Sequence, residues 1–79
     1  MILEKLKALI AQQFGVEESG ITEDVSFEDD LGADSVDFME LSMAIEEEFG
    51  LDEMSEDDVS AIHTVGDLLK FLQDRLEDN

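Results

Sequence analysis

Residues 30 to 50 read DLGADSVDFMELSMAIEEEFG, a stretch in which an acidic loop gives way to a helical pattern. Its apolar side chains recur at three- and four-residue spacing: Phe38, Leu41, Ile45 and Phe49. At roughly 100° per residue they share one face of a helix. Gly50 follows the pattern and is a suitable C-cap. The stretch therefore predicts a helix from Ser35 to Phe49 whose apolar face packs into a core.

Two further helices of similar length are expected at the ends of the chain. The apolar pattern of the first runs from Ile2 to Phe14, and Gly15 follows it as a C-cap. The last begins after Thr64, with Asp67 three residues on, the spacing of a capping box. The apolar stripe of the first helix is Ile2, Leu3, Leu6, Leu9, Ile10 and Phe14, and that of the last is Val65, Leu68, Leu69, Leu72 and Leu76.

The remaining segments are a short helix and a long connection. The short helix is expected over residues 56–61, opened by Ser55 and Asp58. Residues 16–33 form a connection that is long for a compact domain, so some of its side chains should hold it to the core. The candidates are Ile21, Val25, Phe27 and Leu31. No segment alternates like a strand. The fold class is therefore predicted to be all-α: a small four-helix bundle with three longer helices, one short helix and a long first loop, in a single domain over residues 1–79.

The charge of the chain limits the kinds of partner it can have. The net charge is −19, from 23 acids against four bases: Lys5, Lys7, Lys70 and Arg75. Such a field repels nucleic acids and anionic membranes and attracts basic protein surfaces. The chain has no cysteine, which excludes disulfides and thiolate sites. No signal-peptide core and no apolar run long enough to cross a bilayer is present, so we expect a cytoplasmic protein that does not insert into membranes. We also expect a monomer.

A second apolar stripe on the predicted helix 35–49 lies nearly opposite the core face. It consists of Val36, Met39 and Met43, and its acidic borders are Glu40, Glu46 and Glu47. One interpretation is that the stripe packs beneath the short helix or the long loop. The other is a docking surface, because methionine adapts to several partners and surrounding acids attract basic ones.

Ser35 lacks the neighbours that a catalytic serine requires. Nucleophilic catalysis needs a general base, and the only histidine, His63, is distant in sequence and has no evident aligned acid. No G-x-S-x-G motif is present. We therefore expect no catalytic residues and no enzymatic activity.

The acids do not form a recognisable metal site. Asp29 and Glu40 fit the ends of an EF-hand loop, but Leu31 and Ala33 stand where oxygen ligands are needed, and Asp34 where glycine is needed. No metal ligand set is predicted, although weak divalent binding at residues 46–48 or 56–58 stays open. A nucleic-acid mimic would fit the charge but would explain neither the GADS stretch nor the second stripe.

A covalently modified serine fits the neighbourhood of Ser35 better. Free N–H groups and the positive end of the helix dipole stabilise an anion at a helix N-terminus. Gly32 permits a tight loop before the serine. Asp34 is placed as the N-cap of the helix, and Asp37 lies in its first turn. One interpretation is that both carboxylates only cap the helix, without a role in recognition.

DLGADSVDFMEL resembles the prosthetic-group motif of acyl carrier proteins, whose core is Asp-Ser-Leu followed by an acidic helix. The likeness covers nearly the whole chain, including SFEDDLGADS, EEEF and the I-x-T-V before the last helix. It implies that Ser35, next to Asp34, carries 4′-phosphopantetheine transferred from coenzyme A by a separate phosphopantetheinyl transferase. Acyl groups would ride on the arm as thioesters. Val36 stands where leucine is usual, and Phe38 is bulkier than the residue often found three after the serine.

The resemblance also implies partners and a cargo site. Helix 35–49 corresponds to the helix by which the family meets its enzymes, so fatty acid synthesis enzymes with basic docking patches are the expected partners. The docking residues would be Val36, Asp37, Met39, Glu40, Met43, Glu46 and Glu47. An acyl chain tucked between helices would be lined by Phe27, Met39, Ala61 and Ile62. We therefore expect a carrier of the fatty-acid-synthesis type. The alternatives are a carrier for a specialised polyketide-type pathway and a non-covalent acidic interaction module.

Overall fold

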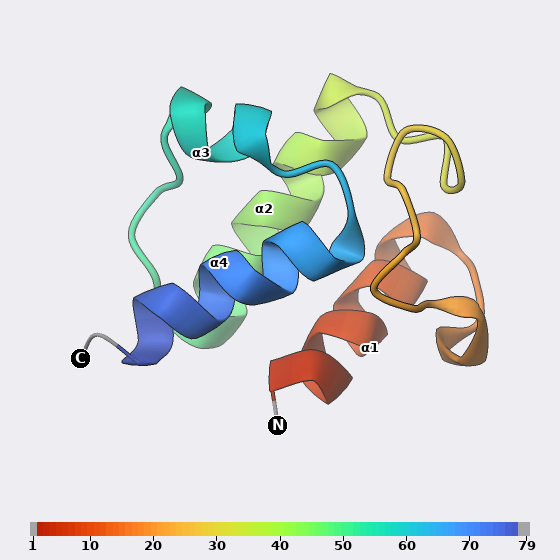
Figure 1. Ribbon diagram of the computed structural model, residues 1–79, viewed down its shortest axis with the longest axis horizontal. Helices are drawn as coiled ribbons and strands as arrows, with labels where there is room; N and C mark the ends of the chain where they lie inside the picture. Colours follow the sequence, from red (N-terminus) through yellow and green to blue (C-terminus); the bar gives the residue numbers. More distant parts are fainter. Residues whose placement is uncertain (1, 78–79) are drawn as a thin grey trace.

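The computed structural model describes residues 2–77, which form four α-helices and one short 3-10 turn (Figure 1). These elements are α1 (Ile2–Phe14), η1 (Glu18–Gly20), α2 (Ser35–Phe49), α3 (Glu56–Ala61) and α4 (Val65–Glu77). The described residues contain no strand, only an isolated bridge between Ser26 and Thr64. The prediction of an all-α fold with three longer helices and one short helix is confirmed.

Three helices, α2, α3 and α4, begin where the sequence supplies a capping residue. At the start of α4, the Asp67 N–H donates to Thr64 Oγ1 at 3.1 Å, and Asp67 Oδ2 accepts the Thr64 N–H at 3.2 Å. Ser55 and Asp58 form the same reciprocal pair at the start of α3. Gly50 ends α2 with φ +66°, a conformation that costs glycine little and other residues more. These local hydrogen bonds explain why the predicted boundaries match the observed ones.

The core lies among α1, α2 and α4. Its fully buried side chains are Leu6, Ile10, Ile21, Leu41, Ile45, Val65, Leu68 and Leu72. The predicted core face of α2 is buried at Leu41 and Ile45, and its outer members, Phe38 and Phe49, are half-buried. The other predicted stripes contribute in the same way, so helical periodicity located the core correctly.

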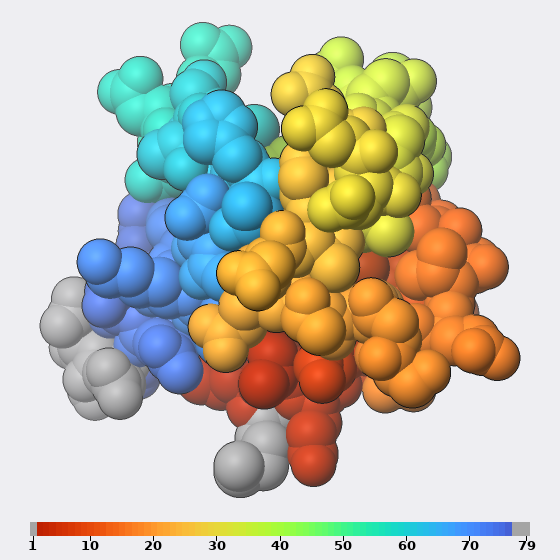
Figure 2. All heavy atoms as spheres, turned by 45° about the vertical axis from the view of Figure 1, so that its right-hand side comes forward, coloured from red at the N-terminus to blue at the C-terminus, as the bar shows by residue number. Residues whose placement is uncertain are grey.

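The long connection, residues 16–33, packs against the core. Ile21 and Phe27 are buried in the core, and the Phe27 ring meets Phe38 edge-on with centroids 5.3 Å apart. The Phe27 N–H donates to the His63 carbonyl at 3.0 Å, and the Val65 N–H donates to the Val25 carbonyl at 3.0 Å. Figure 2 shows the connection as an orange-to-yellow band over the molecule, beside the blue atoms of α4. These contacts fix the course of the chain into α2.

α3 is the least anchored helix. None of its own residues is buried, although Met54 before it and Ile62 after it are. Arg75 of α4 reaches across to α3 with a 3.0 Å ion pair to Asp58, and its guanidinium carbon lies 4.7 Å from the centroid of the Phe71 ring. Both members of the ion pair are solvent-accessible, so we expect it to add little stability.

Candidate functional site

Ser35 is the first residue of α2, at the end of the helix that lies far from both chain ends in Figure 1. Its side chain is exposed, and its hydroxyl makes no hydrogen bond to another group of residues 2–77. The hydroxyl is therefore accessible to a modifying enzyme and is not used to hold the fold.

The two acids around Ser35 cap the helix. Asp34 Oδ1 accepts the Asp37 N–H at 2.9 Å, and Asp37 Oδ2 accepts the Asp34 N–H at 3.3 Å. The N–H groups of Ser35 and Val36, between them, donate to no group that the structure describes. They lie at the positive end of the α2 dipole, where an anion is stabilised. Capping thus accounts for both carboxylates, and two backbone donors are left beside the hydroxyl.

The loop before Ser35 turns sharply at Gly32, whose φ is +64°. A Cβ on Gly32 would meet no atom within 4 Å, so glycine is favoured there by the backbone conformation and not by a close approach. The next residue, Ala33, is buried and donates its N–H to the Phe27 carbonyl at 2.8 Å. This contact links the position of Ser35 to the core.

A hollow of about 650 Å³ lies between α2 and α3 and has Ser35 on its wall. Its lining consists of Ser35, Phe38, Met39, Ser42, Met43, Glu46, Glu53, Met54, Glu56, Val59 and Ser60. Of the four lining residues expected from the sequence, only Met39 is among them. Phe27 and Ile62 are buried in the core instead, and Ala61 is exposed. Phe27 lies behind the lining, against Phe38.

The sequence prediction did not include most of the lining: Phe38, Ser42, Glu53, Met54, Glu56, Val59 and Ser60. Ser42 could have been found, because it lies seven residues after Ser35 and three after Met39, on the same helical face. Met54 and Val59 could not, because their place in the hollow depends on how the 50–55 linker and α3 fold back over α2.

The second apolar stripe of α2 is exposed. Val36 is 62% exposed, and Met39 and Met43 are each 60% exposed. The interpretation that this stripe packs under the short helix or the loop is therefore wrong. Met39 and Met43 also line the hollow, so these two side chains belong both to the exposed stripe and to the hollow.

The acids beside this stripe differ in their hydrogen-bond partners. Glu40 accepts a hydrogen bond from Gln13 Nε2 of α1 at 3.2 Å. Glu46 is half-buried, and its Oε2 accepts the Met54 N–H at 3.0 Å, which ties the linker to α2. Glu47 is exposed and has no such contact among residues 2–77. Glu46 therefore supports the hollow besides adding charge to the surface.

His63 helps to hold the start of α4 through its backbone N–H. Its N–H donates to Asp67 Oδ2 at 3.0 Å, and its side chain is not part of the hollow that holds Ser35. These N–H groups, first that of His63 and then that of Thr64, lower the pKa of Asp67 below its usual 3.8. The pKa of Asp58 is lowered in the same way, chiefly by its hydrogen bonds with Ser55 and further by Arg75.

Within residues 2–77, no three His, Asp or Glu side chains are grouped to hold a metal ion.

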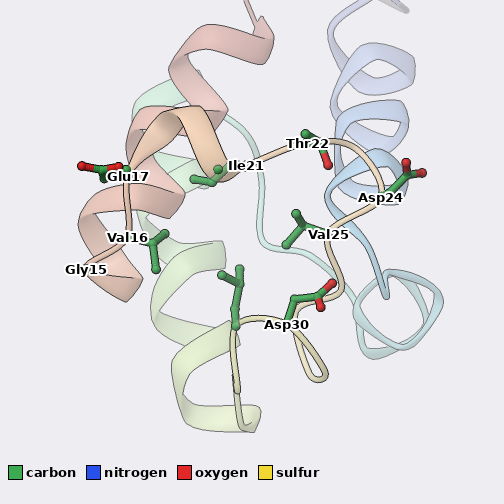
Figure 3. A pocket seen from close by; sticks show the side chains of 10 residues that line it. Gly15, Val16, Glu17, Ile21, Thr22, Asp24, Val25 and Asp30 are labelled. Atoms are coloured by element: carbon green, nitrogen blue, oxygen red, sulfur yellow. The ribbon is translucent and has the colours of Figure 1, made fainter.

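A separate hollow of about 710 Å³ lies where α1 runs into the long connection (Figure 3). Val16 and Val25 point into it, while the carboxylates of Glu17 and Asp24 point away. Its lining consists of Gly15, Val16, Glu17, Gly20, Ile21, Thr22, Asp24, Val25, Asp30 and Leu31, and it includes none of the predicted site residues.

Comparison with protein families gives a match over residues 4–72, to the family described as phosphopantetheine attachment site. The match takes in α1, the long connection, α2, α3 and most of α4. No helix within residues 2–77 combines the length and the apolar character needed to cross a bilayer.

Proposed function

Because the chain belongs to the phosphopantetheine attachment site family, we propose that residues 1–79 form one acyl carrier domain of the fatty-acid-synthesis type, modified at Ser35. Members of this family are non-catalytic carriers, and the prosthetic group is 4′-phosphopantetheine. A phosphopantetheinyl transferase and acyl-handling enzymes are therefore partners of the chain. The choice of serine and of pathway is our proposal.

The exposed Ser35 hydroxyl is the observation that carries this proposal. Attachment makes a phosphodiester, and the free N–H groups of Ser35 and Val36 lie where they can stabilise its charge. In the transfer, Ser35 Oγ attacks a phosphorus of the coenzyme A pyrophosphate and the P–O bond to the nucleotide breaks. The hydroxyl proton must pass to a base, and we propose that the transferase supplies it, since the Asp34 and Asp37 carboxylates each hold a backbone N–H in the helix cap. Asp34 positions Ser35 by capping the helix.

The bound group supplies a thiol that the chain lacks, since the sequence contains no cysteine. The protein's own contribution is to present that thiol and to shelter the acyl group it carries. The hollow beside Ser35 suits the second task because much of its wall is apolar, at Phe38, Met39, Met54 and Val59.

The exposed surface of α2 supports docking on enzymes with basic patches. Val36, Met39 and Met43 form its apolar centre. Negative side chains surround them at Asp37, Glu40, Glu46 and Glu47. Opposite charges on the two proteins speed their encounter and orient them, while the apolar centre supplies contact area. Because the surface starts next to Ser35, a docked enzyme would lie close to the attachment point.

The test is an intact-mass measurement after incubation with coenzyme A and a broad-specificity phosphopantetheinyl transferase. Wild type should gain one phosphopantetheine, and Ser35→Ala should gain none. Ser60→Ala, which changes another exposed serine on the same hollow, should behave like wild type. Modification of Ser35→Ala would refute the assignment of the serine. A folded, unmodified wild type that gains nothing would favour a non-covalent acidic module.

A further inference from the structure

We propose that Ser42 makes the hollow between α2 and α3 selective for acyl chains that bear a hydroxyl group. This inference rests on the proposed function, because the chain must carry an acyl group next to the hollow. It adds a class of cargo and names the residue that selects it.

Ser42 is the one buried polar side chain in the described part of the protein. It is 7% exposed and lines the hollow. The other polar residues of the lining are more accessible to water: Ser35, Glu53, Glu56 and Ser60 are exposed, and Glu46 is half-buried. Water competes for hydrogen bonds at those positions and is largely excluded at Ser42. The well-buried part of the lining therefore contains one hydroxyl, that of Ser42, together with the apolar side chain of Met54.

The orientation of the Ser42 hydroxyl decides what it can bind. Ser42 Oγ donates its proton to the Met39 carbonyl, with 2.7 Å between the two oxygens. The only hydroxyl proton is thus used inside the helix, and the oxygen offers lone pairs to the hollow. A group that donates a hydrogen bond, such as an alcohol, can pair with them. An alkyl chain cannot, and a ketone has only acceptors of its own.

Ser42 also lies where cargo would pass. Seven residues, or about 10 Å along α2, separate it from Ser35 on the same face of the helix. Both residues belong to the wall of the same hollow. An acyl chain tethered at Ser35 that enters between α2 and α3 therefore runs along the wall that contains Ser42.

The experiment measures how well the hollow shelters a thioester from hydroxylamine. Wild type, Ser42→Ala and Ser19→Ala are loaded with hexanoyl-, 3-oxohexanoyl-, 3-hydroxyhexanoyl- or 5-hydroxyhexanoyl-phosphopantetheine, and loading is checked by intact mass. Protection is the rate for the free acyl-pantetheine divided by the rate for the loaded protein, which removes the intrinsic reactivity of each thioester. Backbone amide shifts of residues 42, 54 and 59 report independently whether the chain enters.

In wild type, at least one hydroxylated chain should be protected about two- to tenfold better than the hexanoyl and 3-oxohexanoyl chains, the effect of one net hydrogen bond. Ser42→Ala should abolish that preference while retaining protection of the hexanoyl chain, and Ser19→Ala, which changes an exposed serine outside the hollow, should leave the preference unchanged. An equal preference in wild type and Ser42→Ala would overturn the inference, as would no protection of any chain. Failure of loading would instead overturn the proposed function, so the two failures are distinguishable.

Discussion

At the scale of single residues, four aspartates hold the starts of helices by accepting hydrogen bonds from backbone N–H groups. Asp34, Asp37, Asp58 and Asp67 each accept such a hydrogen bond at the start of a helix. A carboxylate in this position also interacts favourably with the positive end of the helix dipole. The acidity of the chain is therefore partly structural, and the acids beside Ser35 belong to this group.

Asp67 allows this role to be tested through pH. Its pKa is lowered in the folded protein by the N–H groups of His63 and Thr64. The stability it contributes is therefore present above the ordinary value of 3.8 and is lost as pH falls through the lower folded value. We expect the difference in unfolding free energy between wild type and Asp67→Asn to be largest near neutral pH and to shrink below about 3.8. Urea unfolding of both proteins across this range measures it, and a difference independent of pH would contradict it.

At the scale of elements, α2 has two apolar faces with different purposes. Leu41 and Ile45 are fully buried against the core, whereas Val36 and Met43 are largely exposed. α3 has the opposite character: it buries none of its residues and depends on contacts from its neighbours. The hollow lies between an anchored helix and a weakly anchored one, an arrangement in which one wall can move without unfolding the domain.

The exposed face of α2 should tolerate charge without loss of stability. We expect Val36→Asp and Met43→Asp to weaken binding to a partner enzyme at least tenfold while changing the unfolding free energy by no more than about 0.5 kcal/mol. Titration calorimetry and thermal melting provide the two measurements. Val16→Asp, an exposed apolar site away from α2, is the matched control and should bind normally. Melting of the fold by either α2 substitution would show that the stripe is part of the core.

The weak anchoring of α3 should appear in amide hydrogen exchange. Amides of α3 are expected to exchange faster than the central amides of α1, α2 and α4, because local opening exposes little apolar surface. Glu46→Ala removes the acceptor of the Met54 N–H, so exchange at Met54 and along α3 should accelerate further. Glu47→Ala lowers the charge equally but removes no such hydrogen bond, and should leave these rates unchanged. Equal acceleration by both variants would assign the effect to charge alone.

At the scale of the whole molecule, the charge of −19 opposes compaction. The four bases lie on α1 and α4, and none lies on α2, α3 or the long connection. The long connection, α2 and α3 therefore carry acids only. Added salt screens their repulsion, with a Debye length of about 10 Å at 0.1 M.

The melting temperature should therefore rise as sodium chloride is added from low ionic strength, most steeply over the first ~0.1 M. Differential scanning calorimetry measures this directly. Sucrose at matched osmolality is the control, since it does not screen charge. A melting temperature that stays flat across ionic strength would mean that the acids are too well separated, or too well paired with backbone groups, to repel one another strongly.

The sequence by itself determined the helices, their caps and the exposed serine at the start of α2. These features depend on residues three or four apart, such as Thr64 with Asp67 or Leu41 with Ile45, so periodicity and capping chemistry suffice to locate them. The hollow was decided by the tertiary structure, because it needs Met54 and Val59 to fold back over Met39 and Ser42. The sequence prediction placed Phe27 and Ile62 in that lining; both are in the core, since their burial depends on packing between segments distant along the chain. Tertiary packing likewise gives Glu46 its contact with Met54 and leaves the Val36, Met39 and Met43 stripe exposed, because only the assembled fold determines which surfaces remain uncovered.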